Sequence, residues 1–443
     1  MKRKRTSDDE TDTEAETVSE TTIMRNSFLA DKKNKIIQNL VMSKPSWMFE
    51  NHELHRVKLD KVVPHEVKPR INITDQKQTG RCWMYGTLHP AAVLTSKKYK
   101  LGRNFFFSTA HLFFYHKLES IISLLKYLIS VEELDLDDDE HDYLIHCQAH
   151  EGGYSNHLRN LVEKYGLIPA NQYRDVEHTE NTRSLNKALK LKLNAVRAEL
   201  LRLPRSRRES YVNTVKQEFY NILCYYLGTP PAKVTFRFKN PKTKSDKTIT
   251  VTPLEFYRDY VPYDFAEEIY FINDPTKKYD QLYRQHPYKT NVHGKELVYW
   301  NKDISAISNY IKKSINKGFT VPFACDIRKN YHYNGLLDED NFKEQNEFLN
   351  IKKISKLERL KYRYGHSTHL MAIVGYDSDR KLFKVANSWG NDYGLSGYIL
   401  MTEEWFAEHT YKIVINKSLL TRADAKLLET SEDITDLELS DIF

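Results

Sequence analysis

Residues 369–390 read HLMAIVGYDSDRKLFKVANSWG, and this stretch sets the first expectation for the fold. Two apolar runs flank the polar residues Asp377–Arg380, which is the pattern of two antiparallel strands joined by a tight turn. If the chain folds back about that turn, the numbers of opposed residues sum to about 757. His369 and Asn387 then face each other within one residue of register. The stretch therefore predicts a hairpin with a His–Asn pair.

An asparagine beside a histidine has a possible chemical meaning. A side-chain carbonyl oxygen that accepts a hydrogen bond from an imidazole fixes the tautomer and the direction of the ring. His366 is the rival histidine, but its opposite residue would be Gly390, which has no side chain. An isolated His–Asn pair is more often an ordinary polar pair, so a catalytic interpretation needs a nucleophile as well.

The stretch QKQTGRCW at residues 76–83 offers that nucleophile. Residues 82–99 carry apolar side chains at helical spacing after a turn-forming segment, so we expect a helix that begins at Cys82 and is kinked or split at Pro90. A helix N-terminus and a nearby imidazolium lower a thiol pKa from about 8.5 to roughly 3.5–7.5. The backbone N–H of Cys82 and the amide of Gln76 are candidate donors to an oxyanion. A structural cysteine is the alternative.

Composition indicates a folded protein without a disulfide framework. The chain has 443 residues, of which 40% are hydrophobic and 12% aromatic, which suffices for a large core. Its four cysteines are too sparse for a disulfide scaffold and lack C-x-x-C spacing, so we expect reduced thiols, no metal and no cofactor. The sequence has neither a secretory signal nor an apolar run that could span a membrane. We expect a cytoplasmic protein; the Lys2–Arg5 cluster is either a nuclear signal or a solvated tail.

Charge is distributed unevenly along the chain. The net charge is +7, and residues Arg183–Arg208 contain nine Lys or Arg and one acid. Residues 427–443 contain six acids and no base. Such local polarity indicates separate surfaces with separate partners. The basic segment is either a nucleic-acid contact or, more simply, a solvated helix face or subunit contact.

The residues above resemble those of the papain-like cysteine peptidases, and most closely the bleomycin hydrolase and aminopeptidase C branch. Six stretches carry this resemblance in order along the chain: DQKQTGRCWMYG, EGGYSNHLRNLVEKYGLIP, TPLEFYRDYVPYDFAEEIYFINDPTKKYDQLY, GLLDEDNFKEQNEFLNIKKISKLERLKYRYG, THLMAIVGYD and VANSWGNDYGLSGYILMTEEWF. The resemblance runs from about residue 50 to about residue 415. Together these motifs are highly specific, although each alone would not be.

The resemblance implies an α+β, papain-like two-lobe fold, with a helical lobe, a β-barrel-like lobe and a large helical insertion. The order of the sequence patterns agrees with this fold, because helical patterns come first and strand patterns last. The expected organisation is a disordered tail at 1–22, a helical lobe with Cys82 at 23–174, a basic helical insertion at 175–290, a β-rich lobe at 291–416 and an acidic tail at 417–443.

The resemblance also implies roles for individual residues. Cys82 is the nucleophile, His369 the general acid and base, Asn387 the residue that orients His369, Gln76 an oxyanion donor, Trp389 a shield for the His–Asn hydrogen bond, and Gly152 and Gly153 the strip that pairs with the substrate backbone.

The implied activity is a thiol-dependent peptidase, most simply an aminopeptidase of broad specificity acting on peptide substrates. The branch forms hexameric rings in which the terminal carboxylate of the chain binds the substrate's α-ammonium. Here the acidic ending LLETSEDITDLELSDIF departs from the usual one, so an endopeptidase with an open cleft is an alternative. A nucleic-acid-binding ring with secondary protease activity is another, and an inactive scaffold is a third.

Overall fold

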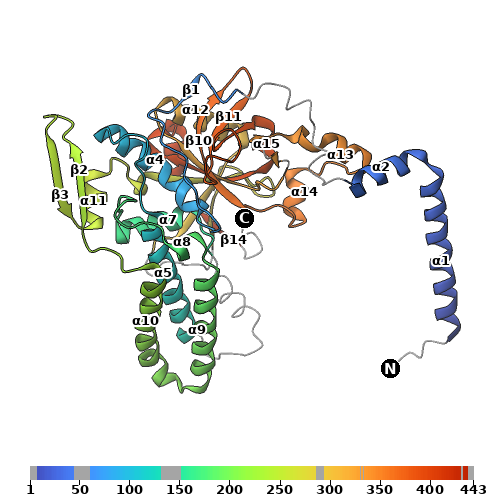
Figure 1. Cartoon of the computed structure of the whole chain (residues 1–443), viewed down its shortest axis with the longest axis horizontal. Coiled ribbons are helices and arrows are strands. Elements are labelled where there is room, and N and C mark those ends of the chain that lie inside the picture. The colour runs from blue at the N-terminus through green and yellow to red at the C-terminus, as the bar shows by residue number, and fades with distance from the viewer. Residues whose placement is uncertain are drawn as a thin grey trace. The chain divides into compact units, whose positions relative to one another are not determined.

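The computed structural model describes residues 7–43, 60–130, 151–285, 294–329, 331–332, 334–430 and 433–437. Its internal contacts divide the chain into two compact units. The small unit comprises residues 1–57 and 342–352, and the large unit comprises 58–341 and 353–443. The candidate active site lies entirely in the large unit, which Figure 1 shows as helices packed against a sheet.

The described helices alternate with strands only in the second half of the chain. They are α1 (Ser7–Ala30), α2 (Lys32–Ser43), α4 (Cys82–Tyr99), α5 (Thr109–Ser130), α7 (Ser155–Tyr165), α8 (Glu177–Glu180), α9 (Arg183–Arg202), α10 (Arg205–Leu227), α11 (Pro253–Tyr260), α12 (Ile304–Asn316), α13 (Lys343–Phe348), α14 (Lys356–Lys361), α15 (Glu403–His409) and α16 (Arg422–Thr430), with short 3-10 turns at Phe265–Glu267, Glu339–Phe342 and Lys417–Leu419. Within the described ranges, no helix is both long enough and apolar enough to cross a membrane.

Most strands join one mixed sheet. The strands are β1 (His65–Glu66), β2 (Val234–Lys239), β3 (Asp246–Val251), β4 (Glu268–Ile272), β5 (Leu282–Gln285), β6 (Leu297–Asn301), β7 (Val321–Cys325), β8 (Tyr331–His332), β9 (Leu336–Leu337), β10 (His369–Asp377), β11 (Leu382–Ala386), β12 (Tyr398–Thr402), β13 (Thr410–Asn416) and β14 (Ile434–Leu437). The large sheet has the order β14-β5-β6-β4-β13-β7-β10-β11-β12-β9-β8, with β1 on β10, while β2 and β3 form a separate hairpin. The predicted α+β class is confirmed.

The predicted hairpin at residues 369–390 forms, but its turn lies one residue later than expected. Asp377 is opposite Leu382, and Ala372 is opposite Ala386, so opposed numbers sum to 759 or 758 and the predicted 757 is wrong. Asp377 belongs to the strand because its carboxylate accepts hydrogen bonds from the backbone N–H groups of Asp379 and Arg380, both at 3.0 Å, and thereby closes the turn. An irregularity between Ile373 and Gly375 supplies the remaining shift.

Helix α4 begins at Cys82 as predicted and packs against β10 and β7. It continues through Pro90, so the expected split is wrong; the buried face of the helix on both sides of the proline holds it together. Gly86 permits the close approach to β10, because a Cβ atom there would lie 2.3 Å from Leu370 Cδ2 and 3.1 Å from the carbonyl oxygen of Met371. The same approach brings the start of α4 to the start of β10.

The basic segment folds as the antiparallel pair α9 and α10, which lie side by side in Figure 1. Helix α9 buries an apolar stripe that consists of Leu185, Leu189, Leu193, Val196 and Leu200. The range 175–290 is not helical throughout, however. It also contains the β2–β3 hairpin and the strands β4 and β5 of the large sheet. Most side chains of β4 and β5 are buried, and they lie on both faces of the sheet, as in a strand that is covered on both sides.

Both ends of the chain also differ from simple tails. Residues 7–22, expected to be disordered, belong to α1, a helix rich in Glu, Asp and Thr whose side chains over residues 19–30 are exposed. The Lys2–Arg5 cluster lies outside the described residues. In the acidic tail, β14 pairs in parallel with β5, and Asp436 accepts a 2.7 Å hydrogen bond from Arg284. The tail therefore extends the sheet up to Leu437.

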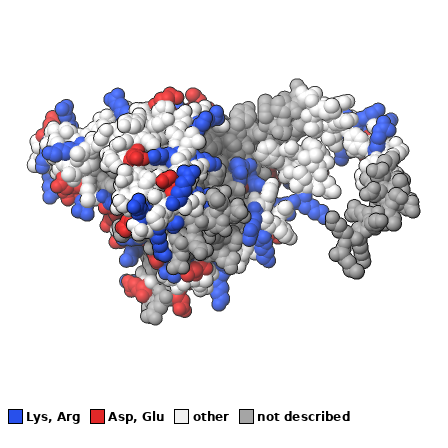
Figure 2. Space-filling model, turned by 90° about the horizontal axis from the view of Figure 1, so that it is seen from below, with Lys and Arg blue, Asp and Glu red and all other residues white. Residues whose placement is uncertain are grey.

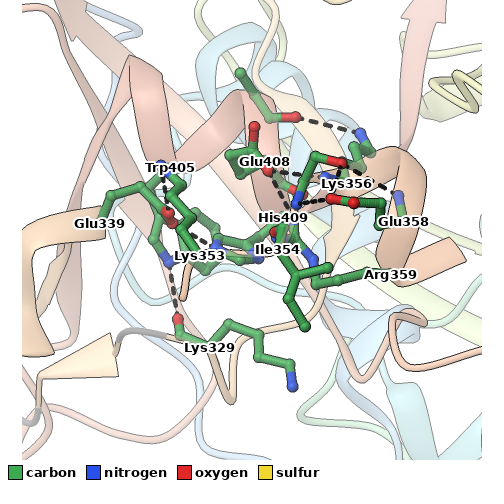
Figure 3. A network of polar contacts seen from close by, with 12 residues as sticks. Lys329, Glu339, Lys353, Ile354, Lys356, Glu358, Arg359, Trp405, Glu408 and His409 are labelled. Atoms are coloured by element: carbon green, nitrogen blue, oxygen red, sulfur yellow. Dashed lines mark hydrogen bonds and ion pairs between the residues drawn. The ribbon is translucent and has the colours of Figure 1, made fainter. Parts of the chain in front are cut away.

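A buried polar network fixes α14 and α15 beside the start of β13 (Figure 3). Lys356 Nζ donates to Asn273 Oδ1 at 2.6 Å, and Arg359 Nη2 donates to Glu408 Oε2 at 2.8 Å. Glu339 accepts from His409 Nε2. Burial opposes ionisation of Glu339, but the hydrogen bonds from His409 and Lys353 outweigh it and lower the pKa to about 2. Cationic and anionic members of this network thus satisfy one another inside the protein.

Candidate active site

His369 and Asn387 form the hydrogen-bonded pair that the sequence predicts. The two strands stop pairing at Ala372 and Ala386, and beyond that point His369 Nε2 lies 2.8 Å from Asn387 Oδ1. Both side chains are buried. Because an amide oxygen can only accept, the imidazole proton lies on Nε2 and the lone pair lies on Nδ1. The pair therefore holds a ring whose Nδ1 can take a proton from a neighbouring thiol.

Cys82 lies at the first position of α4 and is partly exposed. Arg81 precedes the helix without a side-chain cap, so the first backbone N–H groups of the helix remain available as donors. Among the described contacts, no hydrogen bond joins Cys82 to His369. Catalytic hydrogen bonds commonly tighten only when substrate is bound, so the lack of this hydrogen bond in the free protein is compatible with proton transfer.

The charge states of the two groups differ from the sequence prediction. Burial raises the pKa of the Cys82 thiol to about 11, although hydrogen bonds from the backbone of Leu370 and Trp83 lower it in part. Burial also lowers the pKa of His369 to about 4, against the opposing effect of Asn387. The expected lowering of the thiol pKa by the helix N-terminus is therefore outweighed by desolvation. Each ion is disfavoured alone, and one proton transfer creates both ions together, so that they stabilise each other.

Gln76 is held in place by Ser388, a residue that the sequence interpretation missed. Ser388 Oγ donates to Gln76 Oε1 at 2.7 Å, and the backbone N–H of Gln76 donates to the carbonyl oxygen of Ser388 at 2.8 Å. Gln76 Nε2 donates to Thr79 O at 2.6 Å. Since an amide nitrogen carries two protons, one remains for an oxyanion. The position of Ser388, directly after Asn387, was the only signal in the sequence.

Trp389 lies against the imidazole of His369. The two ring centroids are 4.6 Å apart, and the planes are inclined by 31°. A large apolar ring in this position limits the access of water to the neighbouring His–Asn hydrogen bond. His366, the rival histidine, instead lies on the surface, where its Nε2 is 3.2 Å from Arg328 Nη2.

The segment before Cys82 is anchored by two further residues that were not singled out. Arg81 is fully buried and donates to Thr109 Oγ1 at 3.0 Å and to Asp175 Oδ1 at 2.6 Å. Glu151 accepts from the backbone N–H of Gly80 at 2.6 Å, and its carbonyl oxygen accepts from Trp83 Nε1 at 2.9 Å. Arg81 was visible in the quoted motif, but only the fold shows that residues 94 positions apart fix it.

Gly152 and Gly153 differ in their surroundings. Gly152 is exposed, and nothing lies within 4 Å of the position that its Cβ would occupy. A Cβ on Gly153 would lie 2.6 Å from the Trp83 ring, so only glycine allows the chain to pass over that side chain. The first glycine thus leaves backbone open to the surroundings, and the second holds it against the cysteine helix. In the described ranges, no three His, Cys, Asp or Glu side chains gather in a way that could hold a metal ion.

A helix that opens on a cysteine, packed against a sheet that presents a His–Asn pair, defines a cysteine-type peptidase of papain-like fold. Residues 16–442 match the family described as the Peptidase C1-like family. The chain belongs to that family.

Curated relatives agree with this assignment. The chain is 31% identical to a bleomycin hydrolase of Homo sapiens over 386 residues, which covers 83% of this chain and 84% of the relative. It is 32% identical to an aminopeptidase C of Lactococcus lactis over 372 residues, which covers 82% and 84%. The crystal structure of PepW from Lactobacillus rhamnosis superposes with a TM-score of 0.87 at 25% identity and covers 98% of both chains.

Proposed function

We propose that this cysteine peptidase is a thiol aminopeptidase of broad specificity that acts through Cys82, His369 and Asn387. The observation that carries the proposal is the His369–Asn387 hydrogen bond beside a helix that begins at Cys82. Relatives named aminopeptidase C and bleomycin hydrolase align over most of the chain and support the amino-terminal specificity.

The proposed reaction uses the imidazole of His369 twice, first to carry the thiol proton to the leaving amine and then to carry a proton from water to the thiolate. The thiol of Cys82 transfers its proton to His369 Nδ1 while the sulfur attacks the carbonyl carbon of the substrate. The resulting oxyanion receives hydrogen bonds from the backbone N–H of Cys82 and from Gln76 Nε2. The imidazolium then protonates the leaving amine, and an acyl-enzyme remains. Water, deprotonated by His369, hydrolyses the thioester and restores the thiol. Asn387 keeps Nδ1 aimed at these atoms throughout.

We assign substrate positioning to two further features. The exposed backbone at Gly152 and Gly153 pairs with the backbone of the substrate, because no side chain blocks its approach. The carboxylate at the end of the acidic tail binds the substrate's α-ammonium, which makes a free amino terminus a requirement. The strand β14 supports this role, because it fixes the tail to β5 as far as Leu437.

Removing residues 438–443 is expected to abolish the requirement for a free amino terminus. This truncation keeps β14 and the buried Leu437, so the sheet is preserved. The full chain should hydrolyse unblocked aminoacyl fluorogenic amides at least about 10-fold faster than N-acetylated ones, because one hydrogen bond to a charged group contributes about 1.5–3 kcal/mol. The truncated chain should hydrolyse both alike. If the truncated chain keeps its preference, the tail is not the determinant; if the full chain cleaves blocked peptides equally well, it is an endopeptidase.

We infer by resemblance that the protein is a homo-oligomer, and a hexamer within this branch. Light scattering on the full chain measures this directly. A mass near that of one 52.3 kDa chain would contradict the inference.

The exposed basic side chains of α9 and α10 favour nucleic acid as a second partner. Arg183, Lys187, Lys190, Arg205 and Arg207 are exposed, while the apolar stripe of α9 faces the protein. Figure 2 shows Lys and Arg side chains on this side of the molecule with Asp and Glu side chains among them. The phosphate groups of a nucleic-acid strand would bind such a surface through charge alone.

Replacing Lys187 and Lys190 with glutamate is therefore expected to weaken binding of a single-stranded DNA oligonucleotide at least about 10-fold at 50 mM salt. Fluorescence anisotropy measures the affinity, and Lys317→Glu, which reverses an exposed charge on α12's C-terminal side, is the control. Affinity of the unmodified chain should fall steeply with added salt. Binding that is absent at low salt, or is insensitive to salt, would exclude this partner.

A further inference from the structure

A small cavity lies next to the candidate active site, between the N-terminal end of α7 and the large sheet. Its volume is about 20 Å³. Leu370, which follows His369, lines it from β10, and Tyr154, which follows Gly153, lines it from the start of α7. Aromatic rings from Tyr270 and Tyr299 make up much of the remaining wall. The cavity is therefore largely apolar and adjoins both the candidate base and the candidate substrate strip.

Two buried polar side chains, Lys412 and Asn156, line this apolar cavity. Lys412 is 8% exposed and Asn156 is 1% exposed. Lys412 Nζ is buried without a hydrogen-bond partner, whereas the buried side chain of Asn156 interacts with the hydroxyl of Tyr299. Unpaired buried polar atoms are uncommon in native proteins because each forgoes its hydrogen bonds to water. An unpaired amine in the wall of a cavity indicates a group that the protein can receive there.

Other buried lysines of this protein show the contrast. Lys384 pairs with Glu66 at 2.7 Å, and Lys302 pairs with Asp424 at 2.6 Å. Lys356 donates to Asn273 and to backbone carbonyl oxygens (Figure 3). Lys412 instead has only aromatic neighbours, with Nζ 3.4 Å from the centroid of Tyr154 and 4.9 Å from that of Tyr299. Burial lowers its pKa, and no acidic group offsets that effect. An anion that entered the cavity would offset this effect and favour the charged amine.

The register of the sheet places Lys412 close to the candidate chemistry. Lys412 on β13 is opposite Ala324 on β7, and Ala324 is opposite Leu370 on β10. The three side chains thus share one face of the sheet, the face on which α4 contacts Leu370 through Gly86. The Tyr154 ring, which is partly exposed, covers Lys412 Nζ from the side of Gly153. A group that displaces this ring reaches the amine from the substrate strip.

We propose that Lys412 and Asn156 form a carboxylate-binding subsite beside the candidate active site, and that it selects peptides with an acidic side chain near the cleaved bond. Lys412 Nζ supplies the charge, and Asn156 Nδ2 supplies a directed hydrogen bond. The carboxylate of Asp or Glu enters as the Tyr154 ring turns aside and enlarges the cavity. The proposal rests on the proposed peptidase function and adds a substrate class to it. A carboxylate from residues 438–443 of the chain itself is the other source of the same group.

The test compares short unblocked peptides that differ only in Glu or Gln at the first or second residue. Initial cleavage rates of the full chain are followed by mass spectrometry of the products. We expect the Glu peptide of one pair to be cleaved at least about 10-fold faster, which is the effect of one charged hydrogen bond lost. Lys412→Met should reduce that ratio to within about two-fold, and Asn156→Ala should reduce it partly. Lys417→Met, an exposed lysine five residues on, removes the same charge and should keep the ratio.

The ratio within one variant is independent of how much of that variant is active, and thermal unfolding shows whether each variant folds. If the carboxylate comes from the chain itself, the full chain shows no preference for Glu, the chain ending at Leu437 acquires one, and Lys412→Met removes it. A ratio near 1 in both chain lengths that Lys412→Met does not change overturns the subsite. Such a result leaves the peptidase proposal intact, because Cys82-dependent cleavage of the Gln peptides tests that separately.

Discussion

Replacing Cys82 with alanine is expected to reduce kcat/KM on unblocked aminoacyl amides by about 10³-fold or more, to the background level. The sulfur is the only atom of the site that can form the acyl-enzyme, and the oxyanion donors without it provide only residual catalysis. Progress curves with a fluorogenic amide measure the loss, and titration with a thiol-alkylating reagent counts the active sites. Folding should be unaffected, because the side chain is small and partly exposed.

Cys224→Ala is the matched control for this experiment. Cys224 is also a partly buried cysteine on a helix, but it lies in α10 among tyrosines and away from the His–Asn pair. It should retain the activity of the unmodified protein and its sensitivity to alkylation. Activity that survives in Cys82→Ala would contradict the mechanism, and activity lost in both variants would point to a general effect of the substitutions.

Replacing His369 with glutamine is expected to lower kcat/KM by about 10²–10⁴-fold at pH 7, the usual contribution of a positioned general base. The shape of the pH profile should change as well. In the unmodified protein, His369 is neutral above its pKa of about 4, so activity should fall as the pH drops below about 4 and the base becomes protonated. Without the imidazole, the thiolate forms only by direct ionisation, and burial raises the pKa of that thiol to about 11. The residual activity of His369→Gln should therefore rise with pH up to the highest pH tested.

His366→Gln provides the control, since it makes the same change three residues away on the surface. Its kcat/KM and its acid limb should match those of the unmodified protein. The interpretation fails if His369→Gln has a flat or falling alkaline profile, or if His366→Gln shows the same loss. The pre-steady-state burst in which the acyl-enzyme accumulates should be measured at pH 7 and at pH 9. Its rate and amplitude separate slower acylation from slower hydrolysis of the thioester.

The motifs decided much of the local structure because they depend on short-range physical chemistry. The helix that begins at Cys82 follows from a turn-forming segment and helical apolar spacing, and the hairpin at 369–390 follows from two apolar runs around a polar turn. Ser108 caps α5 through a 3.1 Å hydrogen bond from the N–H of His111, and Gly166 ends α7 with a positive φ. The predicted His–Asn pair forms even though the predicted register was wrong, because both side chains lie beyond the paired part of the hairpin.

The tertiary structure decided what depends on burial and on residues distant in sequence. The direction of the shift in the thiol pKa could not be predicted, because it depends on how deeply the folded protein buries the sulfur as well as on the helix that the sequence shows. Ser388 and Glu151 hold the site through contacts across 312 and 71 positions, respectively. Lys412 is one of many lysines in the sequence, and only the folded sheet leaves its amine buried beside Asn156 without a partner. The sequence by itself determined which groups could react, while the packing of helix against sheet determined their charge states and what lies beside them.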